Sequence, residues 1–223
     1  MEAYSPLALC YRDGDGVEKS LLNMICMYAI YSQKTGGEIE DIIELFDEGH
    51  PFKLLTEIFI LSSCDDNFEE KWEQLKYVAP IEAKAFEIAK DSFTTEDDSV
   101  VINIMRELEN EGSELAVMIQ AAYYDGAIDE TGKKECLTRI AEKYPFFNLL
   151  LGDVYAEKYR DSEDFSYIQN AIECYYKADA YGMLIPNYAN KLSGMYDKFG
   201  QKGLIEYDKQ EIERLKILAK RTF

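Results

Sequence analysis

The sequence contains few of the residues from which metal and catalytic sites are built. It has one histidine, His50, and five cysteines, and no two cysteines form a C-x-x-C pair. A zinc site of His and Cys ligands needs more of these residues, and a Ser-His or Cys-His catalytic pair would depend on His50 alone. His50 itself lies between Gly49 and Pro51, where a turn is predicted. We therefore expect no enzyme, no metal and no cofactor.

Long apolar runs are missing as well. Segments such as 58–61 and 146–151 are far shorter than the roughly 20 residues that span a bilayer. Arg12, Asp13 and Asp15 interrupt the segment where the apolar part of a secretion signal would lie. Most cysteines occupy apolar positions of predicted helices, where they behave as small hydrophobes, so a reducing cytoplasm is the expected location.

Basic residues are scarce in the first half of the chain. Residues 1–112 contain 9 Lys and Arg against 25 Asp and Glu, whereas residues 113–223 contain 15 against 18, within a formal net charge of -19. This charge repels phosphate backbones and anionic lipid surfaces. We expect no nucleic acid and no membrane as partners, and instead a basic protein or peptide. Acidity that only keeps the protein soluble is the alternative.

A helical spacing recurs along the chain. Its idealised form is A-x-x-L-G-x-x-Y-x-x-G, in which positions 1, 4, 5, 8 and 11 share one face of a helix. Small residues at this face allow a neighbouring helix to come close, and the Tyr ring fills the gap one turn later. Four segments carry it: Tyr4, Leu7, Ala8, Tyr11 and Gly14; Ala116, Ile119, Gln120, Tyr123 and Gly126; Asn148, Leu151, Gly152, Tyr155 and Lys158; and Ala189, Leu192, Ser193, Tyr196 and Phe199.

Gly and Pro residues lie between the periodic stretches of the sequence, and their positions predict helices joined by short turns, without strands. The predicted spans are 4–13, 18–35, 38–48, 51–64, 67–78, 80–93, 97–111, 114–125, 129–143, 145–159, 163–181, 185–198 and 203–221. Ser113 is expected to begin the helix at 114, and the acids of 161–164 to lie at the start of the helix at 163.

These segments resemble the Sel-one-like repeat family, a branch of the tetratricopeptide-like α/α solenoids. The resemblance rests on the spacing above, on the turn Gly14-Asp15-Gly16-Val17, and on a second-helix pattern. That pattern is carried by Tyr28, Ser32, Gln33 and Gly36, and again by Ala171, Cys174, Tyr175, Ala178 and Gly182. It implies an all-α superhelical solenoid of about six antiparallel helix pairs, forming a single repeat domain over 1–223. The well-matched repeats lie near 4–36 and 114–198, and a capping helix covers 203–221.

The repeats between 38 and 112 are degenerate. Taking Phe59, Phe93, Tyr123, Tyr155 and Tyr196 as equivalent gives spacings of about 30 to 40 residues, typical of one helix pair per repeat. This register makes 38–48 an insertion. A competing register uses Ile39, Ile42, Ile43, Phe46 and Gly49 as the first helix of a repeat, and the sequence does not decide between them.

The resemblance implies a non-enzymatic adaptor that assembles protein complexes. Helix positions 2, 6 and 9 lie opposite the packed face, so they are candidates for contact with a partner along an inner wall. Such positions hold Arg12, Tyr124, Asp153 and Asp197.

Two alternatives to the adaptor stay open. The first is a small acidic antagonist of the immunity-protein type that masks a basic toxin or enzyme. Its candidate residues are Asp41, Glu44, Asp47 and Glu48. The second is a self-assembling structural protein, because the segment 203–221 is locally basic while the first half is acidic.

Overall fold

The computed structural model describes residues 4–27, 46–60, 67–92, 98–126 and 130–220. These residues form α-helices joined by turns and contain no strand, as expected from the sequence. The helices are α1 (Tyr4–Asp13), α4 (Pro51–Ile60), α5 (Phe68–Val78), α6 (Pro80–Ser92), α7 (Asp98–Asn110), α8 (Glu114–Gly126), α9 (Glu130–Lys143), α10 (Phe147–Ser162), α11 (Phe165–Ala180), α12 (Pro186–Gln201) and α13 (Lys209–Ala219). Residues 21–27 are also helical.

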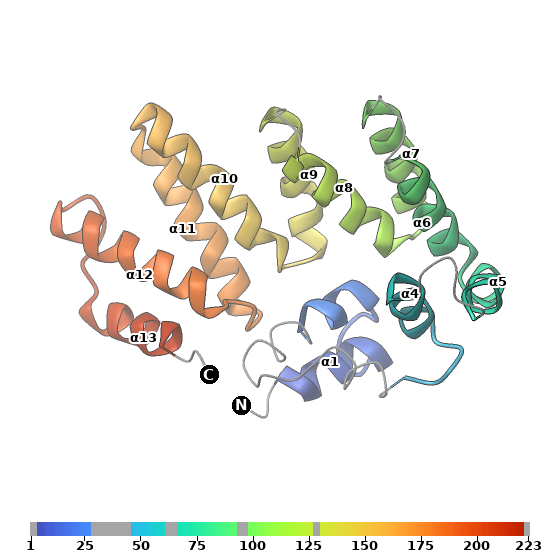
Figure 1. Ribbon diagram of the computed structural model, residues 1–223. Helices are drawn as coiled ribbons and strands as arrows, with labels where there is room; N and C mark the ends of the chain where they lie inside the picture. Colours follow the sequence, from blue (N-terminus) through green and yellow to red (C-terminus); the bar gives the residue numbers. More distant parts are fainter. Residues whose placement is uncertain (1–3, 28–45, 61–66, 93–97, 127–129, 221–223) are drawn as a thin grey trace.

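Each helix from α4 to α13 contacts the next one along the chain. Together these helices follow an arc, with α1 and the helical residues 21–27 beneath its middle (Figure 1). The apolar core is correspondingly divided. One cluster lies among α4, α5 and α6, and a second among α6, α7 and α8.

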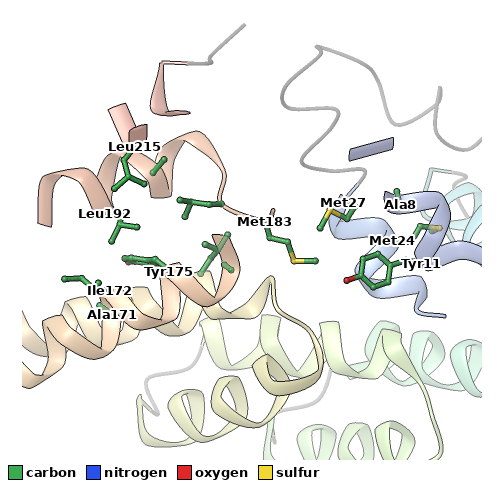
Figure 2. Packing of buried hydrophobic residues seen from close by; sticks show 14 of the residues in the cluster. Ala8, Tyr11, Met24, Met27, Ala171, Ile172, Tyr175, Met183, Leu192 and Leu215 are labelled. Atoms are coloured by element: carbon green, nitrogen blue, oxygen red, sulfur yellow. The ribbon is translucent and has the colours of Figure 1, made fainter. Parts of the chain in front are cut away.

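The N-terminal segment belongs to the core of the C-terminal half. Leu22 and Cys26 pack with buried residues of α8, α9, α10 and α11. Met24 and Met27 share another cluster with Met183 and with residues of α11, α12 and α13. Figure 2 shows Met183, from the turn between α11 and α12, lying between the two groups. Burial, followed by Tyr181 of the same turn, raises the pKa of Tyr11.

Two glutamates link separate helices of this fold, because each accepts hydrogen bonds at the N-terminus of another helix. Glu82 of α6 accepts hydrogen bonds from the Ser113 hydroxyl at 2.5 Å and from the backbone N–H groups of Glu114 and Leu115 at 3.0 and 3.1 Å. Burial raises the pKa of Glu82. The side chain of Glu114 in turn accepts from the Ser20 hydroxyl at 2.7 Å and from the Leu22 N–H at 2.5 Å. One carboxylate thus caps α8, and the next caps the helical residues that begin at 21.

Several predicted boundaries are confirmed and others are corrected. The Ser113 hydroxyl accepts from the Ala116 N–H at 3.0 Å, so Ser113 begins α8 as predicted. The predicted helix 203–221 begins only at Lys209, because Asp208 accepts from the N–H groups of Gln210 and Glu211. Residues 46–50 are turns and bends, so a helix over 38–48 does not extend through 48. Its residues 38–45 lie outside the described part.

The boundary between α10 and α11 also differs from the predicted spans 145–159 and 163–181. Asp161 and Ser162 belong to the last turn of α10, and Glu163 ends that helix with a left-handed φ of 56°. Of the acids at 161–164, Asp164 begins α11 by accepting from the Ser166 N–H at 2.9 Å.

Candidate interaction groove

A hollow of about 410 Å³ lies between α10 and α12, above α11. Both flanking helices carry the recurring spacing, and α11 contacts each of them. Ile168 and Tyr175 of α11 and Met195 and Phe199 of α12 form apolar walls, and charged side chains of α10 and α12 lie around them. We call this hollow the α10–α12 groove.

Close approach of α11 to α10 depends on Gly152. A Cβ at this position would lie 2.4 Å from Cε1 of Tyr175, a distance that no real contact reaches. The Tyr175 side chain is fully buried, and its ring lies directly against the α10 backbone. The small residue predicted at motif position 5 therefore has a direct steric reason in this repeat.

Asp153 joins the three helices at one end of the groove. Its carboxylate accepts from the Tyr175 hydroxyl at 2.6 Å and from the Tyr188 hydroxyl at 3.1 Å. Lys191 of α12 donates to both oxygens at 2.8 Å. Burial, followed by the contact with Asp153, raises the pKa of Tyr175, so this phenol remains a donor. The Asp153 carboxylate thus binds groups of the protein itself, and its role is to hold α11 and α12 in place against α10.

Gly194 leaves the groove open on the α12 side. It occupies motif position 6, the same position that Asp153 has in α10, and it is exposed. A Cβ placed on Gly194 would meet nothing within 4 Å. Position 6, which the opposite-face argument from the sequence selected, borders the groove in both α10 and α12. That argument did not select Gly194 or Lys191, because it considered neither a missing side chain nor an ion pair between repeats.

Of the other candidate contact residues, the described ones, Arg12, Asp47, Glu48 and Asp197, do not line this groove. Asp197 accepts from the Gln201 amide at 2.8 Å and from the Tyr207 hydroxyl at 3.5 Å, toward the turn before α13. Tyr124 lies in α8, with its side chain outside the described part. Asp41 and Glu44 lie outside the described residues.

Arg12 and Asp47 come together in a second hollow, of about 330 Å³, with Lys19 and His50. Arg12 pairs with Asp13 at 2.7 Å. Nearby, Glu48 pairs with Lys53 at 2.7 Å, and this contact lowers the pKa of Glu48. Asp47 and Glu48, the described members of the candidate acidic set, therefore lie among cations.

His50 has a defined structural role beside this hollow. Its Nδ1 accepts from the Phe52 N–H at 3.2 Å at the start of α4, and its ring lies 4.6 Å from that of Phe46. Burial, followed by the charges of Lys19 and Arg12, lowers the pKa of His50 from its ordinary value of 6.5. The folded protein thus favours the neutral imidazole that can cap α4.

This arrangement predicts a pH dependence of stability. Below pH 6.5 the unfolded chain takes up the proton more readily than the folded chain, so the free energy of unfolding falls as the pH drops. We expect the contribution of His50 to be about 0.5–1 kcal/mol, the usual effect of a helix cap. His50→Asn keeps an acceptor without titrating. The difference between wild type and His50→Asn in urea unfolding should therefore change between pH 7.5 and 5.5, and a constant difference would contradict the assignment.

Among the described residues, no group of three or more His, Cys, Asp or Glu side chains is placed to hold a metal ion. No described helix combines the length and the apolar character needed to cross a membrane. Cys26, Cys136 and Cys174 are buried free thiols, and burial raises the pKa of each.

Comparisons with known proteins do not extend this description. No family model matches the chain, and no curated protein or solved structure matches it either.

Proposed function

We propose that this chain is a non-enzymatic protein–protein interaction scaffold in the cytoplasm, built as an α/α superhelical solenoid of Sel-one-like repeats. Support for the solenoid comes from the recurring spacing and from the contacts of each helix with the next along the chain. The α10–α12 groove is the docking site, and its occupant is a peptide segment of a partner protein. The observation that carries this proposal is the open hollow beside Gly194.

The groove has the characteristics of a site for a side-chain anchor. Ile168 and Phe199 are each only 2% exposed, so its apolar walls are set into the core and belong to a preformed surface. Small, concave and mainly apolar hollows with a few placed polar groups are typical binding sites. We place docking here, and not on the acidic first half, because Arg12, Lys19 and Lys53 lie among the described acids of that half.

Filling the groove tests the proposal. Peptides selected from a display library on the wild-type protein should bind Gly194→Trp at least about tenfold more weakly, a loss of about 1.4 kcal/mol in binding free energy. The indole would occupy the hollow, and the exposed helical position should accept the substitution without loss of folding. Fluorescence polarisation gives the affinities, and thermal unfolding by circular dichroism checks the fold.

Ala122→Trp is the matched control. Ala122 is an exposed position of α8, away from the groove, and it receives the same indole. Selected peptides should bind this variant within about twofold of wild type, since surface substitutions outside an interface have little effect. Equal binding to Gly194→Trp, or a selection that enriches no peptide, would overturn the proposal.

A further inference from the structure

The charges around the α10–α12 groove differ in sign from the charge of the chain as a whole. Three cations, Arg160, Lys191 and Lys198, and two carboxylates, Asp153 and Glu157, line it, whereas the chain has a formal net charge of -19. The expectation of a basic partner was based on the acidic first half, and this groove lies in the other half. Its own charges must therefore be considered by themselves.

The cations are unevenly distributed along the groove. Asp153 and Lys191 form an ion pair across it and neutralise each other. Arg160 and Lys198 each lie two helical turns further along α10 and α12, a rise of about 10 Å. Because α10 and α12 run in roughly the same direction (Figure 1), Arg160 and Lys198 lie on the same side of this ion pair, and both side chains line the groove. One end is thus neutral, and the other has two cations and one carboxylate, that of Glu157.

These two cations are available to a partner's carboxylate. Arg160 contacts Glu157 of its own helix at 3.3 Å, and the two side chains are 72% and 59% exposed. An exposed pair of this kind contributes little and exchanges readily. Nζ of Lys198 lies 5.2 Å from the centre of the Phe199 ring, which places an ammonium group directly above an apolar wall of the groove.

We propose that the groove binds an acidic segment of a partner protein, with one large apolar side chain in the hollow and Asp or Glu side chains beside it at the Arg160–Lys198 end. This inference rests on the proposed function and names the chemistry of the occupant. A basic segment would place its cations against Arg160 and Lys198, a repulsive arrangement. The apolar walls select the anchor, and the two cations select the charge beside it.

Three synthetic peptide pools test the proposal. Each has a central Leu or Phe in an otherwise identical, N-acetylated and C-amidated frame, and the flanking residues are Glu, Ser or Lys. At about 0.15 M salt the Debye length is about 8 Å, so the remote acidic half has little effect on binding. By fluorescence polarisation, the wild-type protein should bind the Glu pool about tenfold more tightly than the Lys pool, with the Ser pool between them.

Charge reversal supplies the decisive variants. The double substitution Arg160→Glu with Lys198→Glu should invert the preference, so that the Lys pool binds more tightly than the Glu pool. Lys216→Glu is the matched control, because Lys216 lies in the last turn of α13 as Lys198 lies in the last turn of α12. Both lysines complement a helix dipole, and only Lys198 lines the groove. The control should keep the wild-type preference.

The outcomes separate the inference from the proposed function. Equal binding of the Glu and Lys pools, with loss of both in Gly194→Trp, would overturn the acidic specificity and keep the groove as the docking site. Binding that Gly194→Trp leaves unchanged would overturn the docking site itself. Absence of binding by all three pools would overturn both.

Discussion

Replacing Gly152 by alanine is expected to lower the free energy of unfolding by about 2 kcal/mol. A single added methyl group in a filled core costs about 1–3 kcal/mol or more, and the improved helix propensity of alanine offsets up to about 1 kcal/mol of that cost. Here the methyl group would lie 2.4 Å from the ring of Tyr175. That ring cannot move aside readily, because it is buried and its hydroxyl is hydrogen-bonded to Asp153. Urea unfolding followed by circular dichroism measures the change.

Gly194→Ala is the control, and it should change the free energy of unfolding in the opposite direction. The new methyl group meets nothing within 4 Å, so only the helix propensity changes, and we expect stability to rise by about 0.5–1 kcal/mol. If both variants shifted in the same direction, the close contact between α10 and α11 would be contradicted. Gly194→Ala also supports the binding test with Gly194→Trp, since it shows whether position 194 accepts a side chain.

Replacing Glu114 by alanine is expected to destabilise the protein by about 2–3 kcal/mol. The change removes the acceptor for the Ser20 hydroxyl and the Leu22 N–H, and buried donors left without a partner cost about 1–3 kcal/mol each. Ser20 and Leu22 are 5% and 1% exposed, so water does not readily replace the lost acceptor. Hydrogen exchange should show the Leu22 amide losing protection before the amides of α11.

Glu107→Ala is the comparison for the Glu114 variant. Glu107 is an exposed residue of α7, and its loss changes the net charge by the same amount. We expect a change within about 0.5 kcal/mol, as is usual for surface substitutions. A loss of stability in Glu107→Ala as large as that in Glu114→Ala would mean that overall charge, and not capping of residues 20–22, accounts for the effect.

Local patterns in the sequence predicted local structure well. The recurring spacing located α10 and α12 and placed small residues where helices meet, as Gly152 demonstrates. Turn-forming residues in the sequence predicted most helix ends to within a few residues of their observed positions. The late start of α13 also had a signal, because Asp208 and Glu211 form the D-x-x-E pattern of a capping box.

Contacts between distant parts of the chain had no such signal. Glu114 reads as an ordinary acid in the first turn of a helix, and only the fold shows that its carboxylate caps residues 20–22. Lys198 likewise reads as a cation near a helix end. Its place above the groove depends on how α10, α11 and α12 pack, and helical periodicity contains no information on that geometry. The net charge of the chain was equally uninformative about the groove, because it sums the charges of surfaces that differ in sign.

The packing of the first residues on the last helices affects how the chain folds during synthesis. Met24 and Met27 find their neighbours in a cluster that includes Met183 and Leu192. A ribosome adds about 5–20 residues per second, so these methionines wait roughly ten seconds or more before that part of the core emerges. Throughout this interval the nascent N-terminal segment exposes apolar side chains to which a chaperone can bind. The chain therefore completes its fold only after release of its C-terminal helices, and a truncation that removes α11–α13 leaves Met24 and Met27 without most of their cluster.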